Sequence, residues 1–492
     1  MFDLDINLDY KNPDFFSYIN VERFNGRTIS IASQPEMHLE IEKSDIKYEN
    51  ENLYSEKYRP QIHFSAKRGW LNDPNGLFFY NGKYHLFFQH NPAGCQWGNM
   101  HWGHAVSSDL LHWEELECAL YPDCLGTVFS GSAVVDYHNV TGLKQGSHYP
   151  VILFYTAAGG SSLLSEGQKF TQCMAYSIDG GNTFIPYENN PIIDNIIGGN
   201  RDPKVEYDSV SGRYIMALYL DKNDFMLLYS KNLINWEKGQ VINLPCDAEC
   251  PDFYPLAING NPKNVKWVFS TASDKYLVGS FDGNCFKPET EVWQLHYGKN
   301  SYAVQTWSGM VNGRKLRITW NTFEIPGRPF NKCMTFPCEM TLKSENNELS
   351  LCTNPIREIE KLYKNTVILK DLTIDQYTQL SYDLQDECYD IILILKATEY
   401  SFDVRIFGVN IRCEQNQLSV FDCKAPLKFQ DKISLRLLID RTGIDIFIDD
   451  GSAFLSVGAL MDYNLNRLEI VPTDTRFVEQ INISPLKSIW ER

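Results

Sequence analysis

The feature that most constrains the fold is a short motif that recurs four times between residues 59 and 353. Each copy holds a serine, a polar turn and an aromatic residue, which is typical of one strand ending and the next beginning. The serines are Ser107, Ser177, Ser230 and Ser280, and the aromatic residues are Trp113, Phe184, Trp236 and Phe286. The serines are 70, 53 and 50 residues apart. Repeats of about 50 residues with several strands each are typical of propeller blades. The spacing therefore predicts a β-propeller.

A second repeat gives the number of blades. An acidic residue followed directly, or after one residue, by proline occurs at Asp73, Asp202 and Glu249, each time at the start of an expected hairpin. Two further hairpins are expected to begin at Ser130 and near Tyr302, where no acid stands. We therefore predict five blades, with acids at the first, third and fourth.

The first of these hairpins, at residues 76–89, has the clearest signals. Asn81-Gly82 between two aromatic-rich runs is a strong signal for a two-residue hairpin turn. Just before the first strand, Pro74 favours an extended conformation at Asp73 and so gives its carboxylate a defined direction. Taken alone, Asp73 is as compatible with capping a turn as with a functional site.

The innermost strands of a propeller run side by side around one axis, so the three acids are predicted to share one pocket. Clustered carboxylates serve divalent metal binding or glycosidic bond cleavage. Calcium loops place their ligands within about a dozen residues, whereas these acids come from separate repeats. Aromatic residues near them suit the apolar faces of a sugar, namely Trp70, Trp97, Phe129 and Tyr254. In a retaining glycosidase one carboxylate attacks and a second, kept protonated by neighbouring negative charge, protonates the leaving oxygen.

After residue 353 the pattern changes. Residues 354–363 are expected to form a linker with a short helix, and residues 364–492 alternate as strands of an antiparallel β-sandwich. The predicted fold class is all-β, a five-bladed β-propeller at 59–353 followed by a C-terminal antiparallel β-sandwich. Residues 1–58 are expected to be an appended segment, and their pattern is compatible with a small sheet. The sandwich is compatible with a structural role, an oligomerisation surface or a secondary sugar site.

The composition limits the classes of partner and substrate that the protein is expected to bind. The net charge of −17 argues against nucleic acid and anionic membranes and favours a neutral, carbohydrate substrate. No stretch approaches 18 apolar residues, and the N-terminus lacks the pattern of a signal peptide. The 13 cysteines show no Cys-x-x-Cys spacing, so we expect reduced thiols and a cytoplasmic protein. His101 and His104 would point to opposite faces of a strand, so no metal and no cofactor are expected. A homo-oligomer is compatible with the sequence.

Six motifs carry a resemblance to a known family. They are WLNDPNG at 70–76, Gln89, WGNMHWGHA at 97–105, FSGS at 129–132, RDPK at 201–204 and ECPD at 249–252. Together they resemble glycoside hydrolase family 32, which includes invertases, inulinases and levanases. The segment DRTGIDIFIDDG at 440–451 is similar to the sandwich that this family appends. The resemblance implies a five-bladed propeller with the active site in its axial cavity, and cleavage with retention of configuration.

The resemblance also implies a role for each matching residue. Asp73 would be the nucleophile, Glu249 the general acid and then base, and Asp202 the stabiliser of the transition state. The positions that would line the fructose pocket are Asn72, Gln89, Trp97, Phe129, Ser130, Arg201 and Trp320. Two positions depart from the family pattern, since Ala248 and Asn200 stand where the family often has tryptophan and another aromatic residue. These departures concern the leaving-group side more than the recognition of fructose.

Within the family, WGNM at 97–100, SYAVQTW at 301–307 and the extension before the propeller are similar to exo-acting members. The resemblance therefore implies an exo-acting β-fructosidase that releases terminal β-D-fructofuranosyl units from fructo-oligosaccharides, inulin- or levan-type fructans and sucrose. The alternatives are a sucrose-6-phosphate hydrolase, a fructosyltransferase and a catalytically silent fructan-binding propeller.

Overall fold

The computed structural model describes residues 53–491 except 311–312, 328, 346–347, 375–379, 397–400, 429–431 and 473–475, with residues 6, 21–22, 25–28, 30, 42 and 44. The expected small sheet within residues 1–58 therefore lies largely outside the described residues. Helical structure among the described residues is limited to 3₁₀ segments such as η2 (Leu163–Ser165) and η3 (Arg357–Leu362). None of the helices in this part of the chain has the length and apolar character needed to cross a membrane.

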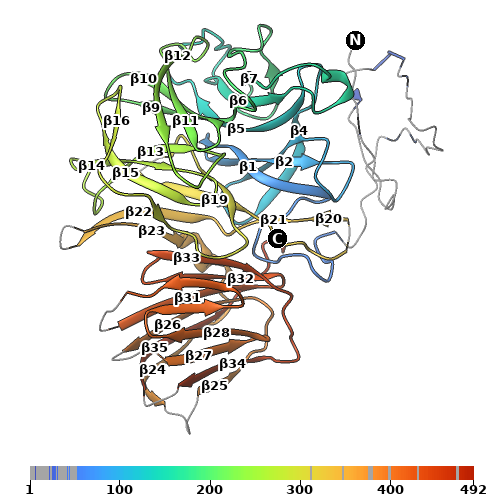
Figure 1. Cartoon of the computed structure of the whole chain (residues 1–492). Helices are drawn as coiled ribbons and strands as arrows, with labels where there is room; N and C mark the ends of the chain where they lie inside the picture. Colours follow the sequence, from blue (N-terminus) through green and yellow to red (C-terminus); the bar gives the residue numbers. More distant parts are fainter. Residues whose placement is uncertain are drawn as a thin grey trace.

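Five sheets form the upper part of the molecule (Figure 1). The first contains β1 (Gly69–Tyr80), β2 (Lys83–Asn91), β3 (His101–Ser107), β4 (Trp113–Leu120) and the late strand β20 (Phe330–Asn331). The second contains β5 (Thr127–Val135), β6 (Val151–Ala158), β7 (Thr171–Ser177) and β8 (Ile185–Pro186). The third contains β9 (Arg201–Asp208), β10 (Arg213–Asp221), β11 (Asp224–Ser230) and β12 (Glu237–Asn243).

The last two sheets complete a ring. The fourth contains β13 (Asp252–Ala257), β14 (Val265–Ser270), β15 (Lys275–Phe281), β16 (Phe286–Pro288) and β17 (Trp293–Gln294). The fifth contains β18 (Tyr302–Thr306), β19 (Lys315–Asn321), β21 (Cys333–Met334), β22 (Cys338–Glu345) and β23 (Glu348–Pro355). The strands β1, β5, β9, β13 and β18 contact one another in this order, and β18 returns to β1. The predicted five-bladed propeller is confirmed.

The repeated serine motif forms the turn between the third and fourth strands of a blade. In the first blade the Ser107 hydroxyl accepts the backbone N–H groups of Asp109 and Leu110, at 3.1 and 2.9 Å. The Trp113 indole then donates to the Leu110 carbonyl at 3.1 Å. The third blade repeats this arrangement with Ser230, Asn232, Leu233 and Trp236. The motif therefore fixes a turn, and its aromatic residue packs back on that turn.

Below the propeller in Figure 1, two six-stranded sheets form the β-sandwich. One contains β24 (Val367–Ile374), β35 (Arg476–Pro485), β26 (Tyr389–Lys396), β31 (Lys432–Asp440), β32 (Gly443–Ile448) and β33 (Ala453–Gly458). The other contains β25 (Leu380–Asp383), β34 (Arg467–Pro472), β27 (Ser401–Ile406), β28 (Val409–Glu414), β29 (Gln417–Val420) and β30 (Cys423–Pro426). All strand pairs in both sheets are antiparallel, as predicted.

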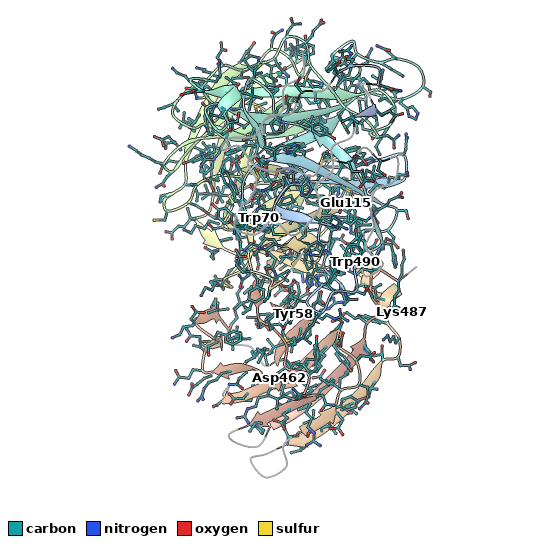
Figure 2. All side chains as sticks on the ribbon, turned by 90° about the vertical axis from the view of Figure 1, so that its right-hand side faces the viewer. Tyr58, Trp70, Glu115, Asp462, Lys487 and Trp490 are labelled. Atoms are coloured by element: carbon teal, nitrogen blue, oxygen red, sulfur yellow. The ribbon has the colours of Figure 1, made fainter. Side chains whose placement is uncertain are left out.

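The end of the chain returns to the junction between propeller and sandwich. Trp490 lies at this level in Figure 2 and donates from its indole to the Pro60 carbonyl at 2.7 Å. Its ring also stacks on Tyr54, with 4.1 Å between the ring centres. One apolar cluster contains buried residues of both units, among them Phe64 and Trp307 from the propeller and Phe447 from the sandwich. The two units therefore share a core.

Candidate active site

The acidic residues lie where the innermost strands meet the axis, and β-bulges set their direction. Asp73 and Pro74 lie inside β1, not before the first strand as the sequence suggested, because β1 already begins at Gly69. The pairing of β1 with β2 shifts register between Leu71 and Pro74, around Asp73. A bulge of this kind bends a strand and turns its side chains. The bulge therefore adds to the effect of Pro74 in directing the Asp73 carboxylate.

The same device recurs in three other blades. Register shifts occur in β5 at Ser130, in β9 between Arg201 and Lys204, and in β18 between Tyr302 and Gln305. Asp202 and Glu249 also have positive φ values of 64° and 63°, which non-glycine residues rarely adopt. Backbone strain of this kind is concentrated at functional sites. Local backbone irregularity thus turns these side chains toward one region.

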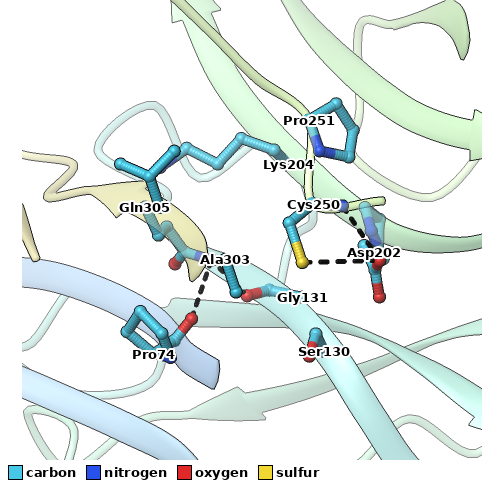
Figure 3. Close-up of a pocket in the computed structure, with 11 residues that line it drawn as sticks. Pro74, Ser130, Gly131, Asp202, Lys204, Cys250, Pro251, Ala303 and Gln305 are labelled. Carbon is cyan, nitrogen blue, oxygen red and sulfur yellow. Dashed lines mark hydrogen bonds between the residues drawn. The ribbon is translucent and has the colours of Figure 1, made fainter. Parts of the chain in front are cut away.

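Hydrogen bonds join Asp73 to its neighbours. The Ser130 hydroxyl donates to Asp73 Oδ2 at 2.6 Å, and Asn72 Nδ2 donates to Asp73 Oδ1 at 3.2 Å. Cys250 Sγ lies 3.8 Å from Asp73 Oδ2 and 3.6 Å from Asp202 Oδ2. Asp202 Oδ2 also accepts the Cys250 backbone N–H at 3.0 Å (Figure 3). Asp73 and Asp202, which are far apart in the sequence, therefore meet around one thiol.

The third acid, Glu249, is held from two sides. Arg201 Nη2 donates to one of its carboxylate oxygens, and the Tyr302 hydroxyl donates to the other at 2.5 Å. The Arg201 guanidinium is itself fixed by the Gly199 carbonyl at 2.7 Å and lies 4.7 Å from the centre of the Tyr219 ring. This role of Tyr302 was not predicted from the sequence. Its signal was its place at the start of the fifth innermost strand, equivalent to the acids of the other blades.

Burial governs the electrostatics of the site. Removal from solvent raises the pKa of Asp73 to about 6, against the opposing effect of the Ser130 hydrogen bond. Burial also raises the pKa of Asp202 to about 7, although the nearby Arg201 lowers it. Burial and the adjacent Asp202 raise the pKa of the Cys250 thiol well above its ordinary value. Cys250 is therefore a neutral thiol between two carboxylates.

The other predicted pocket residues provide aromatic surface and free polar atoms. Trp97 is 59% exposed and stands edge-on to Phe129, with ring centres 6.1 Å apart. Trp320 lies edge-on to Trp70 at 6.1 Å. The side-chain amide of Gln89 and the indole nitrogen of Trp320 are buried and have no partner among the described residues. Buried polar groups are normally paired, so these atoms fit a site that a polar ligand completes.

The structure explains one departure from the family pattern. Asn200 is fully buried, and its Oδ1 accepts from the backbone of Ile196 at 3.0 Å and from Asn195 Nδ2 at 3.0 Å. It therefore closes the loop that leads into Arg201, which an aromatic side chain could not do by hydrogen bonding. At the other departure, Ala248 follows Asp247, which is bound by the hydroxyls of Thr271 and Ser273 at 2.6 and 2.8 Å.

Comparison with known proteins identifies the family. The model of the glycosyl hydrolases family 32 N-terminal domain matches residues 63–355. The chain belongs to glycosyl hydrolase family 32. As a family 32 member it is a glycoside hydrolase, so the predictions of the family and of an enzyme are confirmed.

Similar family 32 proteins are found among sequences and structures. The chain is 33% identical to a levanase of Bacillus subtilis over 89% of this chain and 72% of that protein. It is 28% identical to a fructan beta-fructosidase of Streptococcus mutans over 94% of this chain and 35% of that protein. The crystal structure of an exo-inulinase from Aspergillus awamori matches with a TM-score of 0.79 and 25% identity, over 89% of this chain and all of the other. The chain thus spans about a third of the Streptococcus mutans relative.

Proposed function

We propose that this family 32 chain is a retaining, exo-acting β-fructosidase. It would release terminal β-D-fructofuranosyl units from fructo-oligosaccharides, inulin- and levan-type fructans and sucrose. The observation that carries the proposal is the meeting of Asp73 and Asp202 around Cys250, with Glu249 bound to Arg201 beside Asp202. Relatives named levanase, fructan beta-fructosidase and exo-inulinase support this substrate class.

In the first step, Asp73 attacks the anomeric carbon of the terminal fructosyl unit. The bond from that carbon to the leaving oxygen breaks, and Glu249 gives its proton to this oxygen. Asp73 is poised for this role because its carboxylate is ionised above about pH 6 and oriented by Ser130 and Asn72. Asp202 would accept hydrogen bonds from fructose hydroxyls and stabilise the positive charge that develops on the ring.

In the second step, Glu249 takes a proton from water, and the hydroxide displaces Asp73 to release fructose. Arg201 and Tyr302 both donate hydrogen bonds to the Glu249 carboxylate and hold it in position. The two cleavage steps therefore use one residue in two protonation states.

A substrate panel tests the proposed function. Sucrose, sucrose-6-phosphate, inulin, levan and short fructo-oligosaccharides are each incubated with the protein, and free fructose is measured. We expect fructose as the single small product from fructans, and cleavage of sucrose. A large preference for the phosphorylated sugar would replace the proposal with the sucrose-6-phosphate hydrolase. Trisaccharides with little free fructose at high sucrose would replace it with the fructosyltransferase.

The assignment of the nucleophile predicts the behaviour of Asp73→Asn. Loss of the attacking oxygen should lower kcat by about a thousandfold or more while the thermal unfolding curve stays in place. The matched control is Glu237→Gln, which changes an exposed carboxylate on the outermost strand of the third blade. Activity of Asp73→Asn close to that of the control would refute the assignment.

A further inference from the structure

The segment that carries Glu249 is bound to a neighbouring turn of the same blade. Glu249 lies in the connection between β12 and β13, and the turn at residues 271–274 joins β14 to β15. Asp252 at the start of β13 pairs with Ser270 at the end of β14, so the connection and the turn lie side by side. The Ala272 backbone N–H donates to the Glu249 carbonyl at 3.2 Å. The backbone of the proposed general acid is therefore in direct contact with this turn.

The side chain of Asp247 joins the two segments. Its Oδ2 accepts the Thr271 hydroxyl at 2.6 Å, and its Oδ1 accepts the Ser273 hydroxyl at 2.8 Å. Oδ1 also accepts the backbone N–H of Ala248 at 2.9 Å, and Ala248 directly precedes Glu249. Asp247 is buried, so water competes little for these hydrogen bonds. One carboxylate thus fixes the backbone next to Glu249 and binds it to the turn.

The turn is itself held from the fifth blade. Arg317 on β19 forms two hydrogen bonds to the Asp274 carboxylate, at 2.7 and 2.6 Å, and both side chains are buried. The Thr271 backbone N–H donates to the Lys275 carbonyl at 3.1 Å and closes the turn. The turn is therefore a fixed support to which Asp247 can bind.

The segment around Glu249 needs such support because its backbone conformation is unfavourable. Cys246, Glu249 and Cys250 have positive φ values of 65°, 63° and 41°, which non-glycine residues rarely adopt. A conformation of this kind persists only when the surrounding structure imposes it. The Glu249 side chain is 31% exposed, and Ala248 packs on the apolar core with a single methyl group. Apolar packing therefore contributes little to the position of Glu249, and the hydrogen bonds of Asp247 contribute more.

We infer that Asp247 is a positioning residue for Glu249: its hydrogen bonds to Thr271 and Ser273 hold the Glu249 carboxyl group where it reaches the leaving oxygen. The inference rests on the proposed function and deepens it. Asp247 takes no part in proton transfer, because both of its oxygens already bind other groups. Proton transfer requires heavy atoms within about 3 Å of each other. A displacement of Glu249 by about 1 Å therefore slows a step that needs its proton.

A displaced general acid has a kinetic signature that a general loss of structure lacks. Cleavage of sucrose requires a proton on the leaving sugar oxygen, whereas a nitrophenolate group leaves without one. The parameter kcat/KM covers only the steps up to the fructosyl ester on Asp73, so the later action of Glu249 as a base does not enter it. Displacement of Glu249 should therefore lower kcat/KM on sucrose and spare it on a nitrophenyl β-fructoside.

Asp247→Ala and Asp247→Asn form the central pair of variants. The alanine removes all hydrogen bonds of this side chain. The asparagine oxygen can still accept from Ser273 and Ala248. Its amide nitrogen can donate to the Thr271 hydroxyl, which then turns toward the Lys275 carbonyl 3.2 Å away. The pair therefore separates hydrogen bonding from charge, and thermal unfolding first establishes that each variant is folded.

Two further variants complete the experiment. Asp282→Ala is the matched control, because Asp282 also accepts backbone N–H groups in the fourth blade, those of Asn284 and Cys285, but at the other end of β15. Ser273→Ala removes one hydroxyl that binds Asp247, and Ser273 is only half-buried. If Asp247→Ala does not fold, Ser273→Ala decides the outcome.

We expect kcat/KM of Asp247→Ala to fall about thirtyfold on sucrose and by at most about threefold on the nitrophenyl β-fructoside. Ser273→Ala should show the same selectivity, with a loss of about fivefold on sucrose, because one hydrogen bond is removed. Asp247→Asn should stay within about threefold of the wild type on both substrates, and Asp282→Ala within about twofold.

Two results would overturn the inference. One is an equal loss on both substrates, or no loss on either, in the folded variants Asp247→Ala and Ser273→Ala. The other is an Asp247→Asn variant as impaired as Asp247→Ala, which would assign the effect to charge.

Glu249→Ala, measured on the same two substrates, separates the inference from the proposed function. If Glu249→Ala shows no selective loss on sucrose, the proposed role of Glu249 fails and the inference fails with it. If Glu249→Ala shows this loss and Asp247→Ala does not, only the inference fails.

Discussion

At the scale of single residues, the site depends on a conflict between burial and hydrogen bonding at Asp73. Burial favours the protonated acid and raises its pKa to about 6, whereas the hydrogen bonds from Ser130 and Asn72 favour the carboxylate that must attack. The Asp73 carboxylate is therefore ionised at neutral pH, but its pKa of about 6 lies close to that pH. Small changes around it should be visible as changes in pH dependence.

Ser130→Ala is expected to move the acidic limb of the pH profile. Activity requires ionised Asp73, so kcat/KM falls as the pH drops through the Asp73 pKa of about 6. Without the Ser130 hydrogen bond the carboxylate loses stabilisation of about 1 kcal/mol, and the limb shifts upward by about 0.7 pH unit. The measurement is kcat/KM on sucrose from pH 4 to 8.

Ser132→Ala is the matched control for this prediction. Ser132 lies two residues further along β5, and its hydroxyl bonds to the backbone of Pro203 and Val205 instead of a carboxylate. The acidic limb of the pH profile of Ser132→Ala should stay in place. An unshifted limb in Ser130→Ala would show that this hydrogen bond does not control the ionisation of the nucleophile.

At the scale of elements, one ion pair and its hydrogen bonds connect three of the innermost strands. Lys204 on β9 lies 3.4 Å from Asp252 Oδ2 on β13 and donates to the Thr306 carbonyl on β18 at 2.5 Å. Asp252 Oδ2 also accepts the Thr306 backbone N–H at 2.8 Å. All of these groups are buried. One ion pair therefore connects the strand of Asp202, the strand after Glu249 and the strand of Tyr302.

Lys204→Met is expected to destabilise the protein by about 3–5 kcal/mol, because the buried charge of Asp252 loses its partner. The double variant Lys204→Met/Asp252→Asn should recover part of this loss, since the amide oxygen can still accept from Thr306 and carries no charge. Urea unfolding measures both. Two results would contradict the proposed role of this ion pair. One is equal stability of the wild type and Lys204→Met, and the other is a double variant that is less stable than Lys204→Met.

The sequence predicts much at this scale, because its signals are local. The Asn81-Gly82 turn has the left-handed backbone that a tight hairpin requires, with φ of 50° and 77°. The five blades and the convergence of Asp73 and Asp202 follow from repeat spacing and from the symmetry of a propeller. No local signal showed that Asp73 lies inside a strand, because a bulge is a property of the pairing between two strands.

Contacts between distant segments could not be predicted from the sequence for the same reason. The role of Tyr302 depends on the fifth blade returning to the fourth. The hydrogen bond from Asn331 Nδ2 to the Cys95 carbonyl joins residues that lie most of the propeller sequence apart. Neither pair carries a motif, since each residue is common in loops and strands. Only the three-dimensional arrangement reveals these contacts.

At the scale of the whole molecule, a buried imidazole joins propeller and sandwich. His63 bonds Asp440 Oδ2 through Nδ1 at 2.8 Å and Asp445 Oδ2 through Nε2 at 3.1 Å. Asp440 also accepts the backbone N–H groups of Gln61 and Ile62. Burial opposes a charge on His63, but the two carboxylates raise its pKa to about 10. The segment before the first blade is thereby bound to the sandwich.

His63→Leu is expected to lower the free energy of unfolding by about 3–5 kcal/mol at pH 7, because two buried carboxylates lose their cation. The raised pKa adds a pH dependence. The stability from this charge is fully present below about pH 6.5, the ordinary histidine value. It is lost as the pH rises through about 10. The difference in Tm between wild type and variant should therefore shrink from pH 6 to pH 10.

The exposed pair of His112 and Asp109, with a His112 side chain 41% exposed, is the control. His112→Leu should change Tm by little, because exposed ion pairs contribute about 1 kcal/mol or less. If His63→Leu melts at the wild-type temperature at pH 6, the imidazole does not hold the two units together.

The assignment of roles to the three carboxylates is tested most directly by trapping the covalent intermediate. In Glu249→Ala, a β-fructoside with an activated leaving group can still react with Asp73, but water lacks its base and the second step is slow. Mass spectrometry of a rapidly quenched, digested sample should then find a fructosyl adduct on the peptide that contains Asp73. An adduct on a different carboxylate, or rapid turnover without any adduct, would contradict the proposed mechanism.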